Sequence, residues 1–500
     1  MGTTTAGQNA AMQNLDVVIM GAGMSGLCMA ATLKAAGRQR FVLLEQSAGL
    51  GGTWWDNRYP GAHVDVPAPL YSFSFAPNPH WKRRFAVAAE IQAYMADVAQ
   101  RLGITPHIRC GQRVLAARFD AVQGLWFITV QTEGQPTTTV QAPFFVCSTG
   151  PLSQPRWPDI PGLAGFGGRL LHSARWDVGV PLAGRRVGVI GTGSTAAQLV
   201  APIAKQAAHL TVFQRTANWV LPRVDRRYGR ADHWVAQQPL LSAAVRHGWG
   251  RVLEWGRRGF DDGTLARRSL LRAAARHLQR GVPSAALRQQ LAPPYPLGCK
   301  RIIYSNDYYP ALSRSSTALV TSDITSATPD GIVTADGRLH ALDVLVCATG
   351  FDLQHALAHV PITGLHGQTL VQAWSTGPQP GPQAQLGLTV AGFPNLFLML
   401  GPNTATGHTS TLLFIEPAAR WVLRAMQEVQ RRGQRWLAIK PQVMAAFNTA
   451  LQQRLQSAVW SQCRSWYRAD SGRNIAIWPG YTREYVSAVA NQRFEDFDFG

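Results

Sequence analysis

Two segments of this chain, residues 15–45 and 186–216, each place a short apolar run, a glycine-rich turn and a helical pattern in immediate succession. A buried parallel strand that leads through such a turn into a helix is typical of a dinucleotide-binding unit, in which the first helical amides face a phosphate. A chain of 500 residues is too long for one ordinary core. The two segments therefore predict an α/β fold with two Rossmann-like dinucleotide-binding domains.

The first unit carries GAGMSG at residues 21–26 and closes its second strand with Glu45. Gly21 permits the tight turn, Gly23 lets the backbone approach a pyrophosphate, and Gly26 lets the helix pack closely on the strand. An acid at the position of Glu45 can hydrogen-bond a free ribose hydroxyl. We expect this unit to bind FAD.

The second unit carries GTGSTA at residues 191–196, with Ala196 where the first unit has Gly26. Its second strand is followed by Gln214, Arg215 and Thr216 instead of an acid. A basic residue and a hydroxyl at this point favour a 2′-phosphate. We expect this unit to bind NADPH.

Residues 225–290 have no strand pattern and predict arginine-rich helices inserted in the second unit. The last third of the chain is expected to return to the first unit. The predicted ranges are 12–150 and 386–500 for the FAD-binding domain, 154–224 and 299–380 for the NADP-binding domain, and 225–298 for the helical insertion.

Half of the net charge of +20 comes from residues 221–300, which hold 14 arginines and one lysine against five acids. Such a balance raises nucleic acid or an anionic membrane as a partner. No nucleic-acid motif accompanies it, so no nucleic-acid partner is expected, whereas contact of the insertion with a membrane surface stays open. No run of 18 apolar residues predicts a transmembrane helix.

The six cysteines are scattered and form no CxxC pair. This pattern indicates reduced thiols in the cytoplasm, not a disulfide framework or a zinc site, and no metal is expected. The first residues lack the basic start and apolar run of a signal peptide, and Ala6 stands where a myristoylation signal needs a hydroxyl.

Three further stretches have a structural and a functional interpretation. The glycine- and aromatic-rich loop at 51–61 is either suited to lie against the flat ring of a ligand or is a packed structural loop. Asp65 after it is either a functional acid or a turn residue. Residues 299–304 predict a strand whose Lys300 and Arg301 enter a cleft or form a surface charge pair. Residues 166–177 are a linker or a segment that senses both nucleotide sites, and His408 is expected to be structural.

Taken together, these motifs resemble those of the class B flavoprotein monooxygenases, specifically the Baeyer–Villiger monooxygenases, over roughly residues 14–485. The fingerprint FxGxxxHxxxW(P/D) is the most specific part, because related N-oxygenating flavoproteins usually end it in Phe or Tyr. It is matched by Phe166, Gly168, His172, Trp176 and Asp177. The sequence GAHVD departs from the family near His63 and Val64, where many relatives have a smaller residue or a cysteine.

The resemblance implies an NADPH-dependent enzyme that forms a C4a-peroxyflavin and inserts one oxygen atom of O₂ next to a ketone carbonyl, giving an ester or lactone. It implies Arg301 and Asp65 as catalytic residues: the guanidinium keeps the peroxide anionic and stabilises the oxyanion of the adduct, and Asp65 orients it. His172 and Trp176 are implied to couple domain movement to cofactor position. Trp466 is implied to cover the cofactor.

The implied cofactor contacts combine both turns, the aromatic loop, the cations and the C-terminal tryptophan. They are Gly21, Gly23, Ser25, Gly26, Glu45, Thr53, Trp54, Trp55, Asp56, Asp65, Tyr71, Val114, Gly191, Thr192, Gly193, Ser194, Thr195, Arg215, Thr216, Lys300, Arg301 and Trp466.

The main alternative is an N- or S-oxygenating flavin monooxygenase of the same superfamily. A disulfide reductase shares the two-nucleotide plan but needs a redox cysteine pair beside the flavin, and Cys28 stands alone in the first helix. A non-catalytic binder is disfavoured because Arg301 and Asp65 are both present. The ketone and the oligomeric state are not indicated by the sequence.

Overall fold

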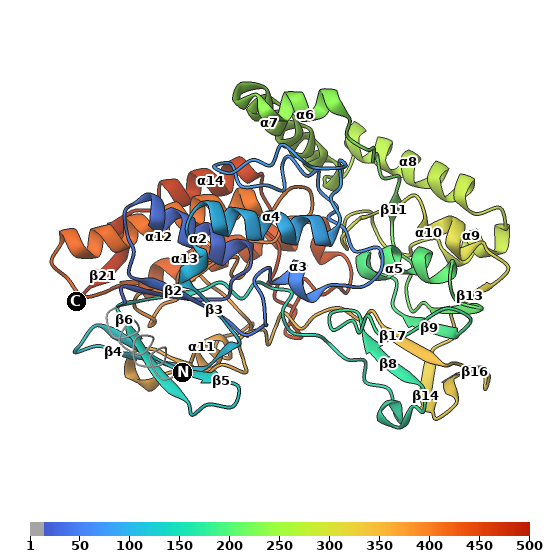
Figure 1. Ribbon diagram of the computed structural model, residues 1–500, viewed down its shortest axis with the longest axis horizontal. Coiled ribbons are helices and arrows are strands. Elements are labelled where there is room, and N and C mark those ends of the chain that lie inside the picture. The colour runs from blue at the N-terminus through green and yellow to red at the C-terminus, as the bar shows by residue number, and fades with distance from the viewer. Residues whose placement is uncertain (1–14) are drawn as a thin grey trace, which may run out of the picture.

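The computed structural model describes residues 15–500 and has two parallel sheets side by side, with a rim of helices above them (Figure 1). The expectations for the first residues, the missing signal peptide and myristoylation signal among them, lie outside the described residues, as does the predicted domain start at residue 12. No helix among the described residues is long and apolar enough to cross a membrane.

The first unit is built on a parallel sheet in the order β19-β7-β1-β2-β3. Its strands in chain order are β1 (Val17–Met20), β2 (Phe41–Glu45), β3 (Ile108–Cys110), β7 (Phe144–Cys147) and β19 (Leu396–Leu398). Val17 and Ile19 point into one core and Val18 and Met20 into another. The sheet is therefore buried on both faces, which explains why its strands are continuous apolar runs.

One face of this sheet is covered by helices and the other by a second sheet. The helices are α2 (Met24–Ala35), α4 (Ala88–Arg101) and α12 (Leu412–Arg431). The second sheet has the order β18-β4-β5-β6, with β4 (Gln112–Asp120), β5 (Leu125–Thr132), β6 (Thr138–Ala142) and β18 (Ile362–Thr363).

Strand β18 differs from the predicted domain ranges. Ile362 pairs with Ala117 of β4, and α11 (Leu370–Trp374) packs against the same core. These residues lie with the first unit, whereas the range 299–380 assigned them to the second. The strand has two residues, too few for an alternating pattern to show its partner.

The second unit has a parallel sheet in the order β13-β10-β9-β17-β8. Its strands in chain order are β8 (Arg169–His172), β9 (Arg186–Ile190), β10 (His209–Phe213), β13 (Thr317–Val320) and β17 (Val344–Cys347). Helices α5 (Ser194–Ala204) and α10 (Tyr308–Leu312) pack on it, and the small antiparallel sheet β14 (Ile324–Thr328), β15 (Gly331–Thr334) and β16 (Leu339–Ala341) extends from it. The two parallel sheets with their helices confirm the predicted fold class.

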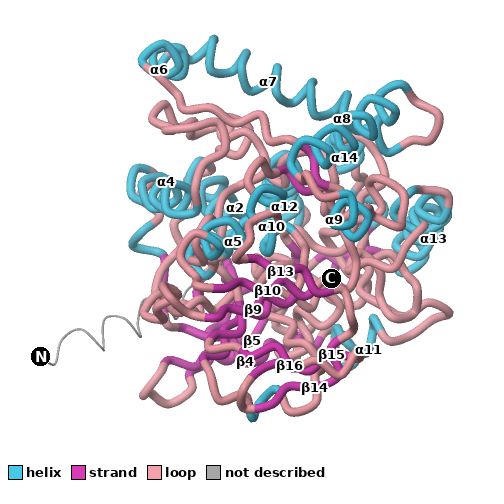
Figure 2. The backbone as a smooth tube through the Cα atoms, turned by 90° about the vertical axis from the view of Figure 1, so that its right-hand side faces the viewer, coloured by secondary structure: helices cyan, strands magenta, loops and turns pink. Residues whose placement is uncertain are grey.

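The helical insertion contributes the upper rim in Figures 1 and 2, although its last helix lies lower, at about the level of α10. It consists of α6 (Arg230–Gln237), α7 (Pro239–Gly256), η3 (Arg257–Phe260), α8 (Leu265–Gly281) and α9 (Ala285–Gln290). The strand predicted over 299–304 is shorter: only β12 (Ile303–Tyr304) pairs, with β11 (Val220–Leu221), and Lys300 and Arg301 precede it in a loop.

The C-terminal third returns to the first unit, as expected. Helix α13 (Pro441–Gln456), β20 (Leu437–Ile439), α14 (Thr482–Ala490) and β21 (Phe497–Phe499) complete it. Residues 351–390 are mostly loop and contain β18, α11 and η4 (Leu365–Gly367). The other short helices are α3 (Thr53–Asp56), η1 (Thr105–His107), η2 (Leu163–Gly165), η5 (Val459–Ser461) and η6 (Phe494–Asp496).

Candidate active site

The first glycine-rich turn lies between β1 and α2. Gly21 has φ +105°, and a Cβ built there would be 2.7 Å from the Ser148 carbonyl oxygen. A Cβ on Gly26 would be 2.0 Å from the Gly21 carbonyl oxygen. No side chain caps the N-terminus of α2, which begins after Gly23. The turn therefore needs its glycines and presents free helical amides, an arrangement that suits a phosphate.

Glu45 ends β2 beside this turn and is buried. Its Oε2 accepts a hydrogen bond from the Ala22 amide at 2.8 Å, and its Oε1 accepts one from the Ser47 amide at 2.8 Å. Burial raises the pKa of the Glu45 carboxyl. The side chain thus fixes the turn itself, and each oxygen keeps a second lone pair that a ribose hydroxyl could use.

The aromatic loop lies directly against the first turn. A Cβ on Gly52 would be 3.1 Å from the Gly23 Cα atom, so the two backbones touch. Trp54 donates a hydrogen bond from Nε1 to the Tyr71 hydroxyl at 3.2 Å and packs edge-on to that ring. The Arg58 guanidinium lies over the ring of Trp55, 4.2 Å from the centroid of that ring. Thr53 and Asp56 bound the short helix α3 of this loop.

The second turn repeats the geometry of the first. Gly191 has φ +116°, and a Cβ there would be 2.5 Å from the Ala348 carbonyl oxygen. Helix α5 begins at Ser194 and Thr195 without a side-chain cap, and a Cβ on Gly193 would meet no atom within 4 Å. The backbone at Gly193 is therefore open on the side where a phosphate would approach.

The loop after β10 is tied to this turn. Thr192 donates a hydrogen bond from Oγ1 to the Thr216 carbonyl at 2.8 Å, and Asn218 donates from Nδ2 to the Thr192 carbonyl at 2.8 Å. Arg215 precedes Thr216 and is exposed. The hydrogen bonds hold Arg215 at the carboxyl edge of the sheet, where nucleotides bind in such folds.

Arg215 and Lys300 lie close enough for their charges to interact. Burial, and next the Arg215 charge, lower the pKa of Lys300. The Lys300 ammonium lies 4.7 Å from the centroid of the Tyr295 ring. Among residues 15–500 neither cation has an ion-pair partner, so two positive charges converge from different segments of the second unit.

Asp65 and Arg301 form a bidentate ion pair, which brings together the two residues expected to be catalytic. Arg301 donates from Nε to Asp65 Oδ2 at 2.8 Å and from one terminal nitrogen to Oδ1 at 2.7 Å. Its other terminal nitrogen reaches only the Thr406 carbonyl, at 3.4 Å. The Asp65 charge raises the pKa of Arg301. The guanidinium is thus permanently charged and oriented, with one nitrogen weakly bonded and 32% of its side chain exposed.

Three tyrosines surround this ion pair. Burial raises the pKa values of Tyr71, Tyr304 and Tyr467 to about 12 each. All three hydroxyls therefore stay neutral near pH 7 and leave Arg301 as the positive group of this cluster. Sequence reasoning identified Tyr71 but not Tyr304 or Tyr467, although both are close in sequence to residues of interest, Arg301 and Trp466.

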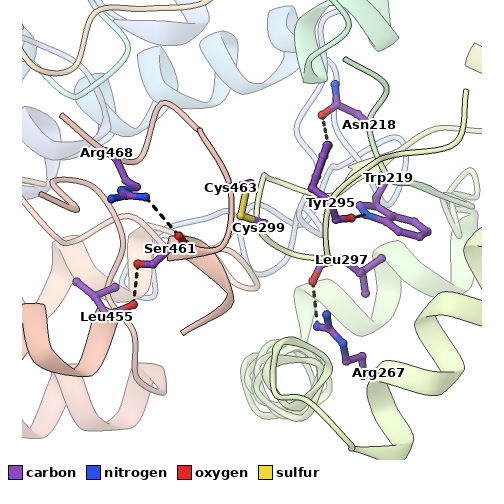
Figure 3. Close-up of a disulfide and its surroundings, with 10 residues drawn as sticks. All are labelled: Asn218, Trp219, Arg267, Tyr295, Leu297, Cys299, Leu455, Ser461, Cys463 and Arg468. Carbon is purple, nitrogen blue, oxygen red and sulfur yellow. Dashed lines mark hydrogen bonds between the residues drawn. A yellow bond between two sulfur atoms is a disulfide. The ribbon is translucent and has the colours of Figure 1, made fainter. Parts of the chain in front are cut away.

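A disulfide between Cys299 and Cys463 links the Lys300–Arg301 loop to the C-terminal loop (Figure 3). The expectation that all six cysteines are reduced is therefore wrong. The two cysteines are 164 residues apart, and no spacing rule pairs them. Cys28 is free and buried, as are Cys147 and Cys347, and Cys110 is free and exposed. The cysteines therefore no longer support a cytoplasmic location, and that location stays a prediction.

Trp466 lies three residues after the disulfide. Its side chain is 41% exposed and packs on Tyr467, with ring centroids 4.3 Å apart. The disulfide joins the loop that carries Trp466 to the loop that carries Lys300 and Arg301, and the role of Trp466 in covering a cofactor stays a prediction. Val114 is buried in β4 opposite Val130 and contacts the core beneath the first sheet. Ser25 is buried in the first turn of α2.

The fingerprint segment forms β8 at the edge of the second sheet and the loop after it. A Cβ on Gly168 would be 2.4 Å from the Asp343 carbonyl oxygen and 2.7 Å from the ring of Phe166, which is buried. His172 is buried, accepts a hydrogen bond from the Ala174 amide at 3.1 Å and packs edge-on to Trp157. Burial lowers its pKa, so His172 is neutral.

The rest of this segment contacts both units. Trp176 packs partly buried against the core of the second unit. Asp177 lies 3.5 Å from Arg169 and accepts a hydrogen bond from the Gly179 amide at 2.8 Å. Arg175, which sequence reasoning missed, lies 3.5 Å from Asp56 of the aromatic loop. This ion pair joins the fingerprint segment to the first unit, and no local pattern indicates it.

His408, expected to be structural, is a buried side chain hydrogen-bonded at Nε2 to Glu254 of α7 at 3.2 Å. Its Nδ1 lies 3.1 Å from the Thr406 hydroxyl, and the Thr406 carbonyl is the group that Arg301 reaches. His63, where the sequence departs from the family, contacts Arg223 through Nε2 and donates a hydrogen bond from Nδ1 to the Gly61 carbonyl, 2.6 Å away.

We expect the stability of the protein to fall between pH 6.5 and 4 partly because of His63. Burial, and next the Arg223 charge, lower the pKa of His63 to about 4 from 6.5, against the opposing effects of Asp65 and Asp225. The unfolded chain binds this proton first, so stability is full above pH 6.5 and is lost as the pH falls toward 4. Urea unfolding at several pH values should show a flatter decline for His63→Gln. An unchanged slope would contradict this assignment.

Comparison with known proteins agrees with this geometry. Residues 14–236 match the model of the flavin-binding monooxygenase-like family. A Baeyer–Villiger monooxygenase of Streptomyces coelicolor is 38% identical over 479 residues, which cover 95% of this chain and 90% of that protein. Among solved structures, an oxidised steroid monooxygenase bound to NADP has a TM-score of 0.84 and 30% identity, covering 97% of this chain and 99% of that one.

A second solved structure, a complex of the protein OTEMO with FAD and NADP, has a TM-score of 0.84 and 27% identity, covering 98% of this chain and all of that one. The likeness extends over both units and the helical insertion, since it spans nearly the whole chain. The chain therefore belongs to the Baeyer–Villiger monooxygenase family of flavin-binding monooxygenases.

Proposed function

We propose that this protein is an NADPH- and FAD-dependent monooxygenase that inserts one oxygen atom of O₂ between a ketone carbonyl and its neighbouring carbon, giving an ester or lactone. The observation that carries the proposal is the bidentate Asp65–Arg301 pair, which fixes the orientation of a partly exposed guanidinium. Its family membership supports the reaction class and both cofactors.

The first unit fits FAD. The uncapped amides of α2 and the close-packed glycines at Gly21 and Gly26 suit the pyrophosphate. The buried Ser148 hydroxyl beside the turn has no hydrogen-bond partner among residues 15–500, so it can bind a ligand. When bound, the flavin supplies the path by which two electrons from NADPH reach O₂.

Arg301 is proposed to stabilise the negative charge that develops on the substrate oxygen. A guanidinium is charged at all working pH values, and one of its terminal nitrogens has only the 3.4 Å contact with Thr406 to give up. Asp65 holds the other two nitrogens and so fixes the plane of the group. A preoriented charge of this kind needs no reorganisation as the oxyanion forms.

The second unit fits NADPH, because Arg215 and Lys300 converge and neither has an acidic partner in the described part of the chain. We expect Arg215→Ala to raise the KM for NADPH by roughly 10- to 100-fold, and to leave the KM for NADH nearly unchanged, since an interfacial charge pair to phosphate contributes about 1.5–3 kcal/mol. Steady-state kinetics with both cofactors would measure this. The matched control is Arg338→Ala, an exposed arginine near the sheet β14-β15-β16. An equal loss with both cofactors would contradict a 2′-phosphate contact.

The proposed reaction is tested with purified protein, NADPH, ¹⁸O₂ and a panel of cyclic and linear ketones, sulfides and amines. The expected result is ketone-stimulated NADPH consumption and an ester that carries one ¹⁸O atom. Turnover of amines or sulfides without any ketone turnover would favour the N- or S-oxygenase. The particular ketone is left to this panel.

A further inference from the structure

The helical insertion exposes an apolar surface that no described part of the chain covers. Eight of the 17 large hydrophobic side chains that are exposed among residues 15–500 lie between Val224 and Leu265, so the surface is concentrated in one short stretch. Its most exposed members on α6 and α7 are Trp234 at 59%, Leu240 at 86%, Val252 at 55% and Trp255 at 57%.

Four exposed apolar residues lie on one side of α7. Leu241, Val245, Val252 and Trp255 recur at offsets 0, 4, 11 and 14, which places them on one face of a helix. We call this set, with Leu240 and Trp234, the apolar face. An isolated exposed apolar residue is ordinary, whereas a continuous helical face of them indicates an interaction site.

The opposite side of α7 is firmly attached to the first unit. Arg246 donates hydrogen bonds to the carbonyls of Pro69 at 3.1 Å and Ser72 at 2.5 Å and lies 3.4 Å from Glu416 of α12. Trp249 and Leu253 pack against the main core. The helix therefore cannot turn to bury its outer face without breaking these contacts.

Helix α8 adds a line of positive charge to the same rim. Arg268, Arg272, Arg276 and Arg280 follow one another at every fourth residue and are exposed. We call them the arginine ridge. Helix α8 has no acidic residue, and within residues 15–500 no ion pair joins any of the four. Like charges at this spacing destabilise a helix, so the ridge is suited to an anionic partner.

The helices that carry the apolar face and the arginine ridge lie at the edge of the molecule. In both Figure 1 and Figure 2, α6, α7 and α8 lie along the upper rim, remote from the two parallel sheets. The inner side of α8 is held by His277, whose Nε2 contacts the Ser305 carbonyl at 2.7 Å, and by the buried Arg267. The outer sides of α7 and α8 therefore both face solvent on this rim.

We propose that this rim binds the surface of an anionic lipid bilayer, with the apolar face inserted among the headgroups and the arginine ridge over lipid phosphates. Tryptophan and leucine on one side with arginine beside them is the composition of interfacial helices. Nucleic acid would leave the apolar face exposed. A symmetric dimer through this rim would bring two arginine ridges together, since a twofold interface repeats the same patch.

Vesicle flotation with the full-length protein tests the proposal. One set of vesicles is pure phosphatidylcholine, and the other contains 30% phosphatidylglycerol, each in about 0.1 M and 0.5 M NaCl, since salt screens exposed charges over about 10 Å and 4 Å respectively. We expect binding to the anionic vesicles that is several-fold weaker at the higher salt concentration, and little binding to the neutral ones.

Two double variants separate the two parts of the surface. Arg272→Ser with Arg276→Ser should weaken binding to anionic vesicles roughly 10- to 30-fold, because each arginine near such a surface contributes roughly a three- to sixfold effect. Trp234→Ser with Trp255→Ser should also release the protein, even at low salt. The matched controls are Arg338→Ser and Val122→Ser, exposed residues outside the rim. Thermal unfolding verifies that each variant is folded.

The proposal is overturned if wild-type protein stays with the soluble fraction on anionic vesicles, or if the control variants lose binding as much as the rim variants. It is also overturned if light scattering shows a dimer that the tryptophan variant converts to a monomer, because the apolar face would then be a protein interface. Salt-sensitive binding to DNA that exceeds binding to vesicles would assign the rim to nucleic acid instead.

Discussion

Replacing Arg301 with alanine is expected to lower kcat for ketone oxygenation by about 10²- to 10³-fold, the usual effect of removing one preoriented donor to a developing oxyanion. The substitution also leaves the Asp65 carboxylate, which is only 21% exposed, without its bidentate partner. We expect Arg301→Lys to recover little activity, because an ammonium group cannot bond both oxygens of Asp65 and still offer a donor in the same plane.

The control for this prediction is the rate at which NADPH reduces the flavin, measured anaerobically. The rate of flavin reduction should change far less than the rate of ester formation. The variant should therefore continue to oxidise NADPH without forming an equal amount of ester. Asp65→Asn should give the same pattern with a smaller loss, because the amide still bonds one arginine nitrogen. Full ester formation in Arg301→Ala would remove Arg301 from the reaction.

Replacing Gly26 with alanine is expected to abolish FAD binding. The new methyl group would lie 2.0 Å from the Gly21 carbonyl oxygen, closer than any real contact. The turn and helix α2 must then separate, and this displaces the amides that suit the pyrophosphate. The purified variant should be colourless, and its thermal unfolding should no longer respond to added FAD.

Gly248→Ala is the matched control, since Gly248 also lies within a helix, α7, but a Cβ there meets no atom within 4 Å. Alanine favours a helix over glycine by about 1 kcal/mol, so this variant should be as yellow as the wild type and equally or more stable. A yellow, stable Gly26→Ala protein would show that helix α2 can move without loss of the site.

Local sequence patterns predicted the parts of the fold that local geometry determines. The turns at Gly21 and Gly191 were predicted because a strand, a reversal with positive φ and a helix follow one another within a few residues. The strand at 299–304 was overextended, since its apolar residues fill the core beside β11 while the backbone before Ile303 is not paired. Burial of these side chains is enough to make the sequence apolar at this point, even where the backbone forms no strand.

Contacts between distant segments could not be derived from the residues themselves. The Asp65–Arg301 pair was expected only through the family resemblance, because neither residue has a neighbour in sequence that indicates the other. The Arg175–Asp56 ion pair and the contact of His63 with Arg223 depend on how the two units meet. The pairing of Cys299 with Cys463 also depends on how the two units meet. The scattered positions of the cysteines in the sequence had instead indicated reduced thiols.

The disulfide also changes how the chain responds to a protease. The exposed stretch at 375–380 lies between Cys299 and Cys463, so a single peptide bond hydrolysed there leaves two fragments that are still covalently joined. They would migrate as one species on a denaturing gel and separate only after treatment with a thiol reductant. A cut in the insertion, before Cys299, would instead release the N-terminal fragment without any reductant. Comparing gels run with and without reductant therefore shows whether the cut lies between the two cysteines or before them.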